Sequence, residues 1–192
     1  MRPGSFLPLP ADPGRKGRVE KAKFHPPPCP ARVKGVVELP PAAPDLRAAD
    51  VVISLGMGVL KDGSGKPKAP REAYGYAEQL KAAIERRYHI KAEIGATRVL
   101  IYSEVKELGG PIGKANQAGQ TGSTVRPKVY FAVGISGAVQ HRVGMQNSSK
   151  ILAINSDPDA PILKIAHYPK VGNLYEVLPN LVRSIGGGRV AE

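Results

Sequence analysis

The sequence predicts an α/β fold, in which a doubly wound, mostly parallel sheet binds ligands at the carboxyl ends of its strands. Two observations support this prediction. Nearly continuous apolar runs rich in Val and Ile, at 50–55, 129–133 and 151–154, are typical of strands buried on both faces. Helical patterns and Gly-rich turns separate or follow these runs, as expected when strands and helices alternate along a chain.

Composition limits the class of protein. A chain of 192 residues with 42% apolar residues has room for one ordinary domain plus an extension. The single cysteine, Cys29, excludes an internal disulfide and fits a reducing compartment, so we expect a cytoplasmic location. No apolar run reaches the length of about 18 residues that a membrane span needs, and the first residues lack a secretory hydrophobic region.

The net charge of +12 raises the question of a nucleic-acid partner. The Lys and Arg residues are spread along the chain, and no zinc, RNP-type or KH-type motif is present. We therefore favour a basic surface that meets an acidic partner protein or a polyanionic cofactor, and we expect no nucleic acid as partner.

Three regions differ in composition. Residues 1–46 form a Pro-rich, basic N-terminal arm that we expect to become ordered only on binding, although the apolar patch at 33–39 also suits an edge strand. Residues 47–186 carry the predicted fold, and residues 187–192 form a Gly-containing tail that we expect to be flexible. Cys29 has no His or second Cys at ligand spacing, so we expect no metal site.

Periodicity and turn residues predict the other elements. The helix that begins at Pro70 carries Tyr76, Leu80, Ala83 and Ile84 on one face, a stripe that should pack in the core. Pro179 should kink or break the last helix. The further expected elements are a strand at 99–102, a helix at 138–145, a strand at 162–166 and a helix at 173–185.

Two glycine signatures point to function: Gly-Gln-Thr-Gly at 119–122 and Gly-Ile-Ser-Gly-Ala at 134–138. The second lies between a strand and the start of a helix, where unpaired N–H groups favour a phosphate or pyrophosphate. Ser136 should cap that helix and contact a phosphate at once, since both uses draw on the same amide end. The Gly-Met-Gly turn at 56–58 is a weaker signal of the same kind.

Taken together, the motifs resemble the C-terminal FAD-binding domain of the electron-transfer flavoprotein alpha subunit, over residues 45–186. The resemblance implies a deoxyhypusine-synthase-like NAD/FAD-binding fold. The motifs are Val-Ile-Ser at 52–54, Gly-Ala-Thr-Arg at 95–98, Gly-Gln-Thr-Gly at 119–122, Ala-Val-Gly-Ile-Ser-Gly-Ala-Val-Gln-His at 132–141, and Ile-Asn-Ser-Asp-Pro-Asp-Ala-Pro-Ile at 154–162.

The resemblance implies roles for individual residues. Arg98 matches the arginine that lies over the isoalloxazine ring, where a cation favours reduced, anionic flavin. Gln120 and Thr121 match the pair that contacts the ring, with Thr121 at N5, and His141 matches a donor near flavin O2. Asn155 matches a residue on the adenosine half. The whole implied cofactor-binding set is Thr97, Arg98, Ala118, Gly119, Gln120, Thr121, Ser136, Gly137, Ala138, Val139, Gln140, His141, Asn155, Asn173 and Leu174, with Ser136, Gly137, Ala138 and Gln140 as the ribityl and pyrophosphate cradle.

The chain also departs from the family pattern. Met57 stands where the family has an arginine, which removes a cation near the cofactor. Thr97 replaces the usual serine, and Asn173 replaces an aspartate, which changes the charge but keeps the hydrogen-bonding ability. The arm at 1–46 stands in place of the family's N-terminal domain, so we expect a separate subunit whose missing part is supplied elsewhere.

The function that the resemblance implies is that of an electron carrier with FAD as cofactor, no catalytic residue and no metal. The implied partners are a beta-type subunit in a heterodimer, acyl-CoA or other flavin dehydrogenases as in fatty acid β-oxidation, a quinone oxidoreductase, and a separate alpha N-terminal domain. Two alternatives remain open: an NAD(P)-binding α/β enzyme domain, and a cofactor-free interaction subunit. The absence of Gly-x-Gly-x-x-Gly and the amide of Asn155, in place of an acid, argue against NAD(P).

Overall fold

The computed structural model describes residues 13–14, 16–23, 34–35, 44–103, 112–120 and 122–187. Its centre is a five-stranded sheet with the strand order β2-β1-β3-β4-β5, in which every pair of neighbours is parallel. The predicted doubly wound α/β fold is therefore confirmed. The strands are β1 (Val51–Leu55), β2 (Ala92–Ala96), β3 (Val129–Val133), β4 (Lys150–Asn155) and β5 (Tyr168–Val171).

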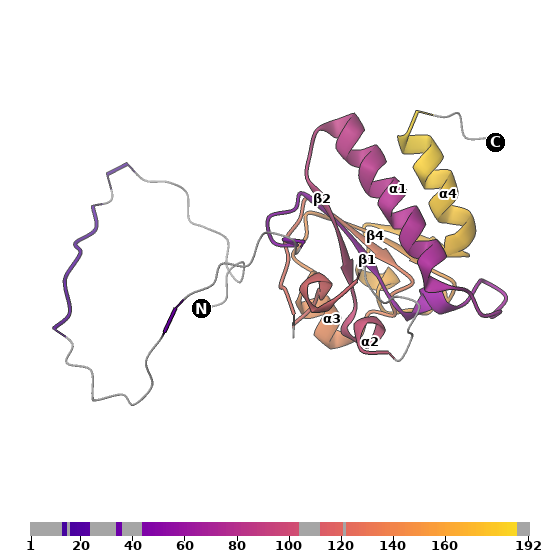
Figure 1. Cartoon of the computed structure of the whole chain (residues 1–192), viewed down its shortest axis with the longest axis horizontal. Coiled ribbons are helices and arrows are strands. Elements are labelled where there is room, and N and C mark those ends of the chain that lie inside the picture. Colours follow the sequence, from indigo (N-terminus) through magenta and orange to yellow (C-terminus); the bar gives the residue numbers. More distant parts are fainter. Residues whose placement is uncertain are drawn as a thin grey trace.

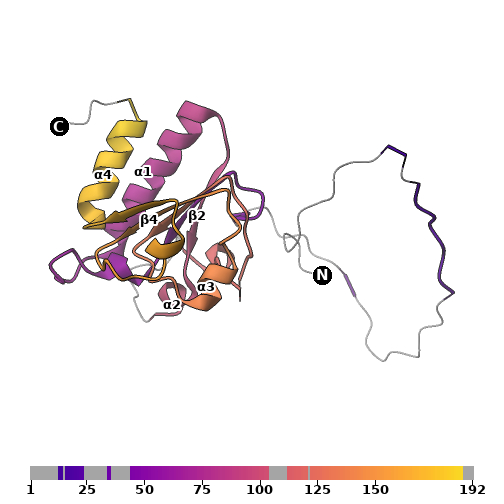
Figure 2. The ribbon, with the colours of Figure 1, turned by 180° about the vertical axis from the view of Figure 1, so that it is seen from behind.

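Two layers cover the sheet. Helices α1 (Pro70–Tyr88) and α4 (Leu174–Ile185) lie side by side over one face, in the view of Figure 1 and from behind in Figure 2. The remaining elements are shorter. They are α2 (Arg98–Ile101), α3 (Val139–Val143), and the 3-10 turns η1 (Met57–Leu60), η3 (Lys114–Asn116) and η4 (Leu163–Ile165).

Alternation along the strands divides the core in two, because successive side chains of a strand point to opposite faces. Ile53 and Phe131 pack on the side of α1 and α4. Val52, Tyr130 and Ala153 pack on the other side, with Met145 from the segment after α3. All five side chains of β1, the strand between β2 and β3, are buried, so both layers cover it.

Helix α1 shows why this sequence folds locally as predicted. It begins with Pro70 and has Glu72 in its first turn, both of which suit a helix N-terminus. Leu80 and Ile84 are buried in the core, and the partly buried Tyr76 packs against it, which confirms the predicted stripe. The helix ends at Tyr88, and the next residue, His89, adopts the left-handed conformation with φ 55° and donates its N–H to the Glu85 carbonyl.

Two predicted strands were wrong. Residues 98–101 form helix α2, because Thr97 accepts a hydrogen bond from the Leu100 N–H at 3.4 Å and so starts a helical turn. The true neighbouring strand, β2, comes just before it. Residues 163–165 form the turn η4, with the Leu163 N–H bonded to the Ala160 carbonyl, and the edge strand β5 begins at Tyr168.

The two C-terminal helices differ from each other in how well they were predicted. Helix α4 is confirmed, with Asn173 as its N-cap, and it runs through Pro179 without a break. Helix α3 is shorter than the predicted 138–145, and its N-cap is Ala138, which offers no side-chain cap. The predicted capping role of Ser136 was therefore wrong.

Some predictions fall on residues outside the described ranges. These are most of the apolar patch at 33–39, Cys29, and residues 188–192 of the tail. Leu46, which precedes the predicted domain start at 47, has 1% of its surface exposed and packs in the core beside Val52. Among the described residues, no helix is both long and apolar enough to cross a bilayer.

Candidate cofactor-binding site

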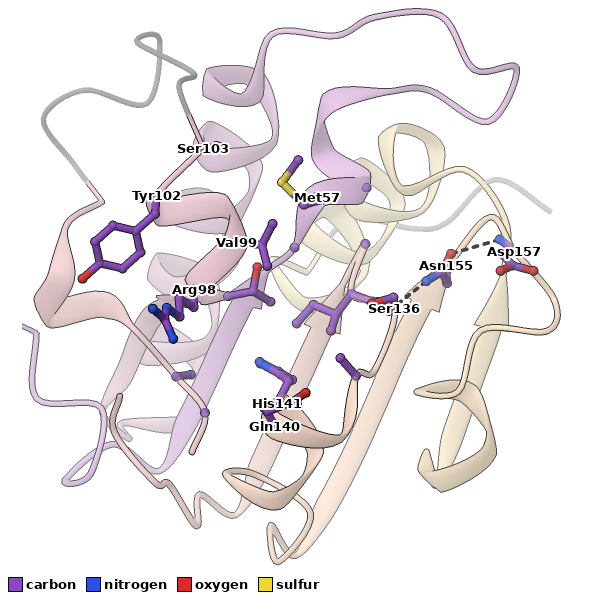
Figure 3. A pocket seen from close by; sticks show the side chains of 18 residues that line it. Met57, Arg98, Val99, Tyr102, Ser103, Ser136, Gln140, His141, Asn155 and Asp157 are labelled. Carbon is purple, nitrogen blue, oxygen red and sulfur yellow. Dashed lines mark hydrogen bonds between the residues drawn. The ribbon is translucent and has the colours of Figure 1, made fainter. Parts of the chain in front are cut away.

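A pocket of about 860 Å³ lies at the carboxyl ends of the strands (Figure 3). The segments that follow β1, β2, β3 and β4 all contribute to its wall, which is where open α/β sheets place their ligands. The described residues that line it are Gly56, Met57, Gly58, Thr97, Arg98, Val99, Tyr102, Ser103, Ala118, Gly119, Gly134, Ile135, Ser136, Ala138, Gln140, His141, Asn155 and Asp157.

The floor of the pocket is a close backbone contact between the turns after β1 and β3. The N–H groups of Gly56 and Gly58 donate to the carbonyls of Val133 and Gly134, at 2.9 and 2.8 Å. A Cβ at Gly58 would lie 2.7 Å from the Gly134 Cα, so a side chain is excluded there. The glycines thus leave bare backbone where the strand order reverses, and a ligand can approach it closely.

Helix α2 brings a cation to the rim. The Thr97 N–H donates to the Leu55 carbonyl at 2.9 Å, which ties the start of α2 to β1. The guanidinium of Arg98 lies 5.9 Å from the centre of the Tyr102 ring, and both side chains are exposed at the pocket (Figure 3). Among the described residues, Arg98 forms no ion pair. Its charge is therefore available to an anionic or electron-rich ligand.

His141, on α3, is the buried titratable group of the pocket. It has 8% of its surface exposed, and its Nε2 lies 3.0 Å from the hydroxyl of the fully buried Tyr130. Burial lowers the pKa of His141 to about 4, against a smaller opposite effect of a hydrogen bond to the Ala118 backbone. The imidazole is thus neutral at physiological pH.

The segment 117–120 closes the side of the pocket next to β2. Gln117 pairs with Ala96 in a parallel bridge, and the Ala118 N–H donates to the Ala96 carbonyl at 3.0 Å. The Gln120 N–H donates to the Gln140 carbonyl on α3 at 2.9 Å. Ala118 and Gly119 line the pocket, Gln120 lies next to the lining, and Thr121 lies outside the described residues.

The turn after β3 presents Ser136 to the pocket. Its side chain is exposed there, and its carbonyl accepts the Ile162 N–H at 3.1 Å. Gly137 has φ 88°, and a Cβ at this position would lie 2.4 Å from the Ile162 nitrogen. Only glycine fits this approach of two backbone segments, so the shape of the turn depends on it.

Asn155 is the last residue of β4, and both polar atoms of its side-chain amide form hydrogen bonds with the backbone. Its Nδ2 donates to the Ile135 carbonyl at 2.8 Å, and its Oδ1 accepts the Asp157 N–H at 2.9 Å (Figure 3). The side chain therefore fixes the turns after β3 and β4 relative to each other. Asp157 joins it in the lining of the pocket.

Five of the predicted site residues that the structure describes lie outside this lining: Gln120, next to it, and four others. Gly137 and Leu174 are buried, and Val139 is exposed on α3. Asn173 caps α4, accepting the Tyr175 N–H at 3.1 Å, and lines a smaller depression of about 480 Å³. That depression contains Ser156, which lies between two residues of the large pocket, so the two hollows are adjacent.

Comparison with protein families identifies the domain that contains this pocket. Residues 45–146 match the model of the electron transfer flavoprotein FAD-binding domain. The chain belongs to this family. The cofactor of the electron transfer flavoprotein domain is FAD, and the resemblance to the alpha subunit is confirmed by the relatives that follow.

Relatives with curated names agree with the family. The electron transfer flavoprotein subunit alpha of Mycobacterium leprae is 42% identical over 155 residues, which are 81% of this chain and 41% of that protein. Protein FixB of Azotobacter vinelandii is 39% identical over 73% of this chain and 33% of its own length. The acryloyl-CoA reductase electron transfer subunit beta of Anaerotignum propionicum is 38% identical over 77% of this chain and 35% of its own. The chain spans between a third and two fifths of the length of these relatives.

The residues of the pocket fit the cofactor of the electron transfer flavoprotein family. FAD combines a flat aromatic ring with an anionic pyrophosphate, and a pocket of this volume lies within the usual range of about 300–1,000 Å³ for small-molecule sites. Bare backbone at Gly58 and Gly134 allows close approach, and Arg98, which has no ion pair with any described residue, supplies a positive charge. Ser136 adds an exposed hydroxyl.

Sequence reasoning missed part of the lining of this pocket. Val99, Tyr102 and Ser103 line it because α2 is a helix; the predicted strand hid them. Asp157 follows Asn155 closely in the same motif, and this closeness in the sequence could have identified it as a pocket residue. Met57 was treated only as a departure from the family, yet its 40% exposed side chain lies at the pocket.

Proposed function

We propose that this chain binds one FAD non-covalently in the large pocket and is the FAD-binding subunit of an electron-transfer flavoprotein. The observation that carries the proposal is the position of the pocket: it lies at the carboxyl ends of four parallel strands of a domain that belongs to the FAD-binding family. Bound FAD supplies reversible electron uptake, and the protein does no bond-making chemistry of its own.

The residues divide the pocket into a ring end and a phosphate end. Arg98, whose guanidinium lies beside Tyr102, suits the flavin ring, because a nearby cation favours the added negative charge of reduced flavin. Ser136 and the turn that contains Gly137 suit the pyrophosphate, since they present a hydroxyl and closely packed backbone. Asn155 holds these parts in place through its two hydrogen bonds.

The adenosine half of FAD would extend toward the smaller depression. Ser156 and Asn173 line that depression, and the 155–157 turn joins it to the large pocket. This direction agrees with the resemblance, which assigns Asn173 and Leu174 to the cofactor. Leu174 would act through the core, because only 5% of its surface is exposed.

The partners follow from the resemblance. We expect a beta-type subunit, a separate alpha N-terminal domain, and electron exchange with acyl-CoA or other flavin dehydrogenases and a quinone oxidoreductase or similar acceptor, in the cytoplasm. Relatives named as parts of an acryloyl-CoA reductase and of a lactate dehydrogenase (NAD(+),ferredoxin) of Acetobacterium woodii support a role inside a larger electron-transfer complex.

Cofactor titration tests the proposal. The purified chain, alone and with a co-expressed beta-type subunit, is titrated with FAD and, in parallel, with NADH by calorimetry. We expect FAD to bind near one equivalent and the complex to show a two-band flavin absorption spectrum. Binding of NADH but not FAD would favour an NAD(P) enzyme domain, and binding of neither would favour a cofactor-free interaction subunit.

Replacing Arg98 tests the ring end of the pocket. In Arg98→Ala the reduction potential of bound FAD should fall, because the reduced anion loses a stabilising cation. Arg98→Lys should retain part of the effect. Arg86→Ala removes the same charge from the exposed last turn of α1 and is the matched control. Equal potentials in Arg98→Ala and Arg86→Ala, measured by dye-linked reduction, would show that Arg98 is not near the ring.

A further inference from the structure

An asparagine side chain closes part of the outer edge of β2. This strand lies at one edge of the five-stranded sheet, so its outward carbonyls need partners from outside the sheet. The Ala96 carbonyl accepts the Ala118 N–H at 3.0 Å, and Ala96 forms a parallel bridge with Gln117. Two residues earlier, the Ile94 carbonyl accepts a hydrogen bond from Asn116 Nδ2 at 2.8 Å. The side chain of Asn116 thus occupies the preceding position of a parallel ladder.

The backbone of Asn116 is not available for that position. Its N–H donates to the Gly113 carbonyl at 2.9 Å, where the chain forms turn η3. In return, Asn116 Oδ1 accepts the Gly113 N–H at 2.9 Å. The amide therefore uses one polar atom on β2 and the other on the start of η3, and it joins the two. Only 6% of the surface of Asn116 is exposed, so water cannot readily replace either bond.

The segment that follows Asn116 forms a wall of the pocket. Ala118 and Gly119 line the pocket directly. The segment packs against β2 beside Gly95, whose Cβ position lies 3.4 Å from the Asn116 carbonyl oxygen and 3.6 Å from the Ala118 Cβ. The position of this wall therefore depends on how the segment is held against the edge of β2.

We infer that Asn116 is a positioning residue for the pocket, whose amide holds residues 117–120 against the carboxyl half of β2. Asn116 does not line the pocket, so it acts through the segment that does. It is also absent from the cofactor-binding set that the resemblance implies. The anchor is a property of the chain alone, whereas its effect on FAD rests on the proposed function.

Hydrogen exchange in the FAD-free, wild-type chain tests the anchor directly. By NMR, the side-chain amide of Asn116 should exchange its protons at least about tenfold more slowly than that of Asn147, because Asn116 is buried and bonded to Ile94. Asn147 is exposed in the turn after α3 and serves as the internal reference. Equal exchange rates in the two side chains would overturn the inference, whether or not any variant folds.

Asn116→Leu tests whether the amide holds the segment. The new side chain is similar in size but can form neither hydrogen bond. The Ala118 N–H should then exchange about tenfold faster, because the segment is released from the edge of β2. The Gly172 N–H, which donates to the Asn155 carbonyl near the opposite edge of the sheet, is the reference and should not change. Unchanged exchange at Ala118 would overturn the anchor.

Asn116→Asp adds a readout that a merely structural role would not give. The ionised carboxylate sets an acceptor against the Ile94 carbonyl, whereas the protonated carboxyl donates to Ile94 and accepts from Gly113, as the amide does. Relative to the wild type at the same pH, FAD affinity should be about tenfold lower near pH 8 and recover toward equality near pH 5. Asn147→Asp adds the same charge at an exposed position and should match the wild type throughout. An FAD affinity of Asn116→Asp that does not recover at the lower pH would overturn the inference.

The anchor and the proposed function fail in different ways. Slow side-chain exchange at Asn116 in a chain that takes up no FAD would refute the proposed function and support the anchor. Wild-type FAD affinity in Asn116→Leu, together with faster exchange at Ala118, would overturn the positioning role and leave the proposed function intact.

Discussion

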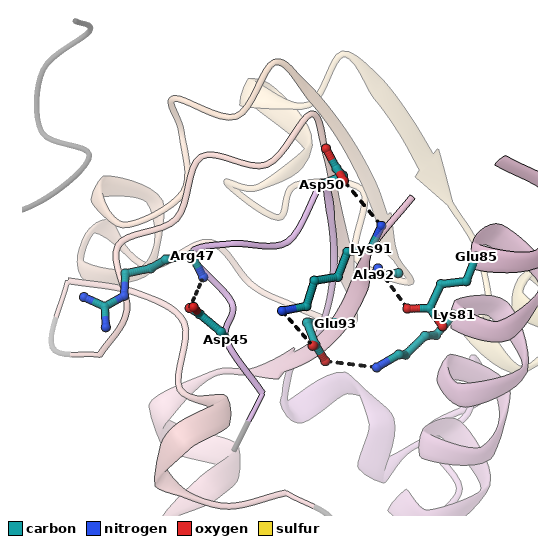
Figure 4. Close-up of polar contacts among 8 residues, drawn as sticks. All are labelled: Asp45, Arg47, Asp50, Lys81, Glu85, Lys91, Ala92 and Glu93. Atoms are coloured by element: carbon teal, nitrogen blue, oxygen red, sulfur yellow. Dashed lines mark hydrogen bonds and ion pairs between the residues drawn. The ribbon is translucent and has the colours of Figure 1, made fainter. Parts of the chain in front are cut away.

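The amino and carboxyl ends of the strands differ in how their polar groups are paired. At the amino end, acidic side chains are paired with backbone N–H groups and lysines (Figure 4). Glu85 accepts the N–H of Ala92 at 3.1 Å, at the start of β2. Glu93, with 13% of its side chain exposed, pairs with Lys81 at 3.0 Å and Lys91 at 3.6 Å.

Asp50 completes the amino end just before β1. Its carboxylate accepts the Lys91 N–H at 3.3 Å and pairs with the Lys128 ammonium at 2.9 Å. The Lys128 ammonium, followed by the Lys91 N–H, lowers the pKa of Asp50. The charges of this end are therefore used within the chain.

At the carboxyl end, glycines replace side chains and a cation is left unpaired. Gly58 and Gly134 expose backbone, and Arg98 has no acidic partner among the residues that the structure describes. The carboxyl end thus leaves bare backbone and one cation for a ligand, although Asn155 and His141 are hydrogen-bonded within the chain. We propose that changes at the carboxyl end affect both stability and FAD binding, whereas changes at the amino end affect stability alone, and three changes test this division.

The largest effect is expected from Gly137→Ala. The new Cβ would clash with the Ile162 backbone and would require a residue other than glycine at φ 88°. These two costs suggest a loss of about 4 kcal/mol in the free energy of unfolding, together with loss of FAD binding. Gly75→Ala in α1 is the control, because nothing lies within 4 Å of its Cβ position. It should instead gain about 0.5–1 kcal/mol in urea unfolding. Equal effects would contradict the steric account.

A second effect is a pH dependence that belongs to the carboxyl end. The folded pKa of His141, about 4, is below the ordinary value of 6.5, so between these values the unfolded chain binds a proton that the folded chain does not. The free energy of unfolding should therefore be highest above pH 6.5 and fall by about 3 kcal/mol toward pH 4 through this group.

Urea unfolding near pH 7 and pH 4 checks this prediction by comparing variants, since carboxyl groups also titrate in this range. His141→Gln should remove about 3 kcal/mol of the pH dependence. His89→Asn, at an exposed position that needs a left-handed conformation, should leave it unchanged. The same pH dependence in all three proteins would mean that His141 is not titrating from a buried, neutral state.

The smallest effect is expected at the amino end. Glu93→Gln removes two ion pairs of a largely buried carboxylate and should cost about 1 kcal/mol in the free energy of unfolding. FAD affinity should not change, because the site lies at the opposite end of the strands. Glu20→Gln, which breaks the exposed pair with Arg18, should have almost no effect. A weaker FAD complex without a stability loss in Glu93→Gln would contradict the division between the two ends.

The sequence pattern was sufficient to predict a strand where the whole segment lies in the buried core. The apolar runs of β1, β3 and β4 could be predicted because strands buried on both faces need apolar residues at every position. The same reasoning failed at 99–102, where Val, Leu, Ile and Tyr suggested a strand. There, the Thr97 cap starts a helix instead, and this helix leaves Val99 63% exposed at the pocket.

The roles of polar side chains depended more on the tertiary structure. Asn155 is a ligand candidate by sequence, and in the fold both ends of its amide are hydrogen-bonded to backbone. Ser136 was predicted as a helix cap, and α3 begins too late for that role. Such partners come from segments distant in the chain, so no local window contains them.

The sequence alone therefore determined β1, β3 and β4, the glycine turns and the family, because periodicity, backbone sterics and ordered motifs are local properties. Only the tertiary structure decided which groups stay free for a ligand. Among the residues that the structure describes, Arg98 forms no ion pair, whereas His141 is occupied because β3 places the Tyr130 hydroxyl beside it. Pairing depends on distance in space, and that distance is set when the strands take the order β2-β1-β3-β4-β5.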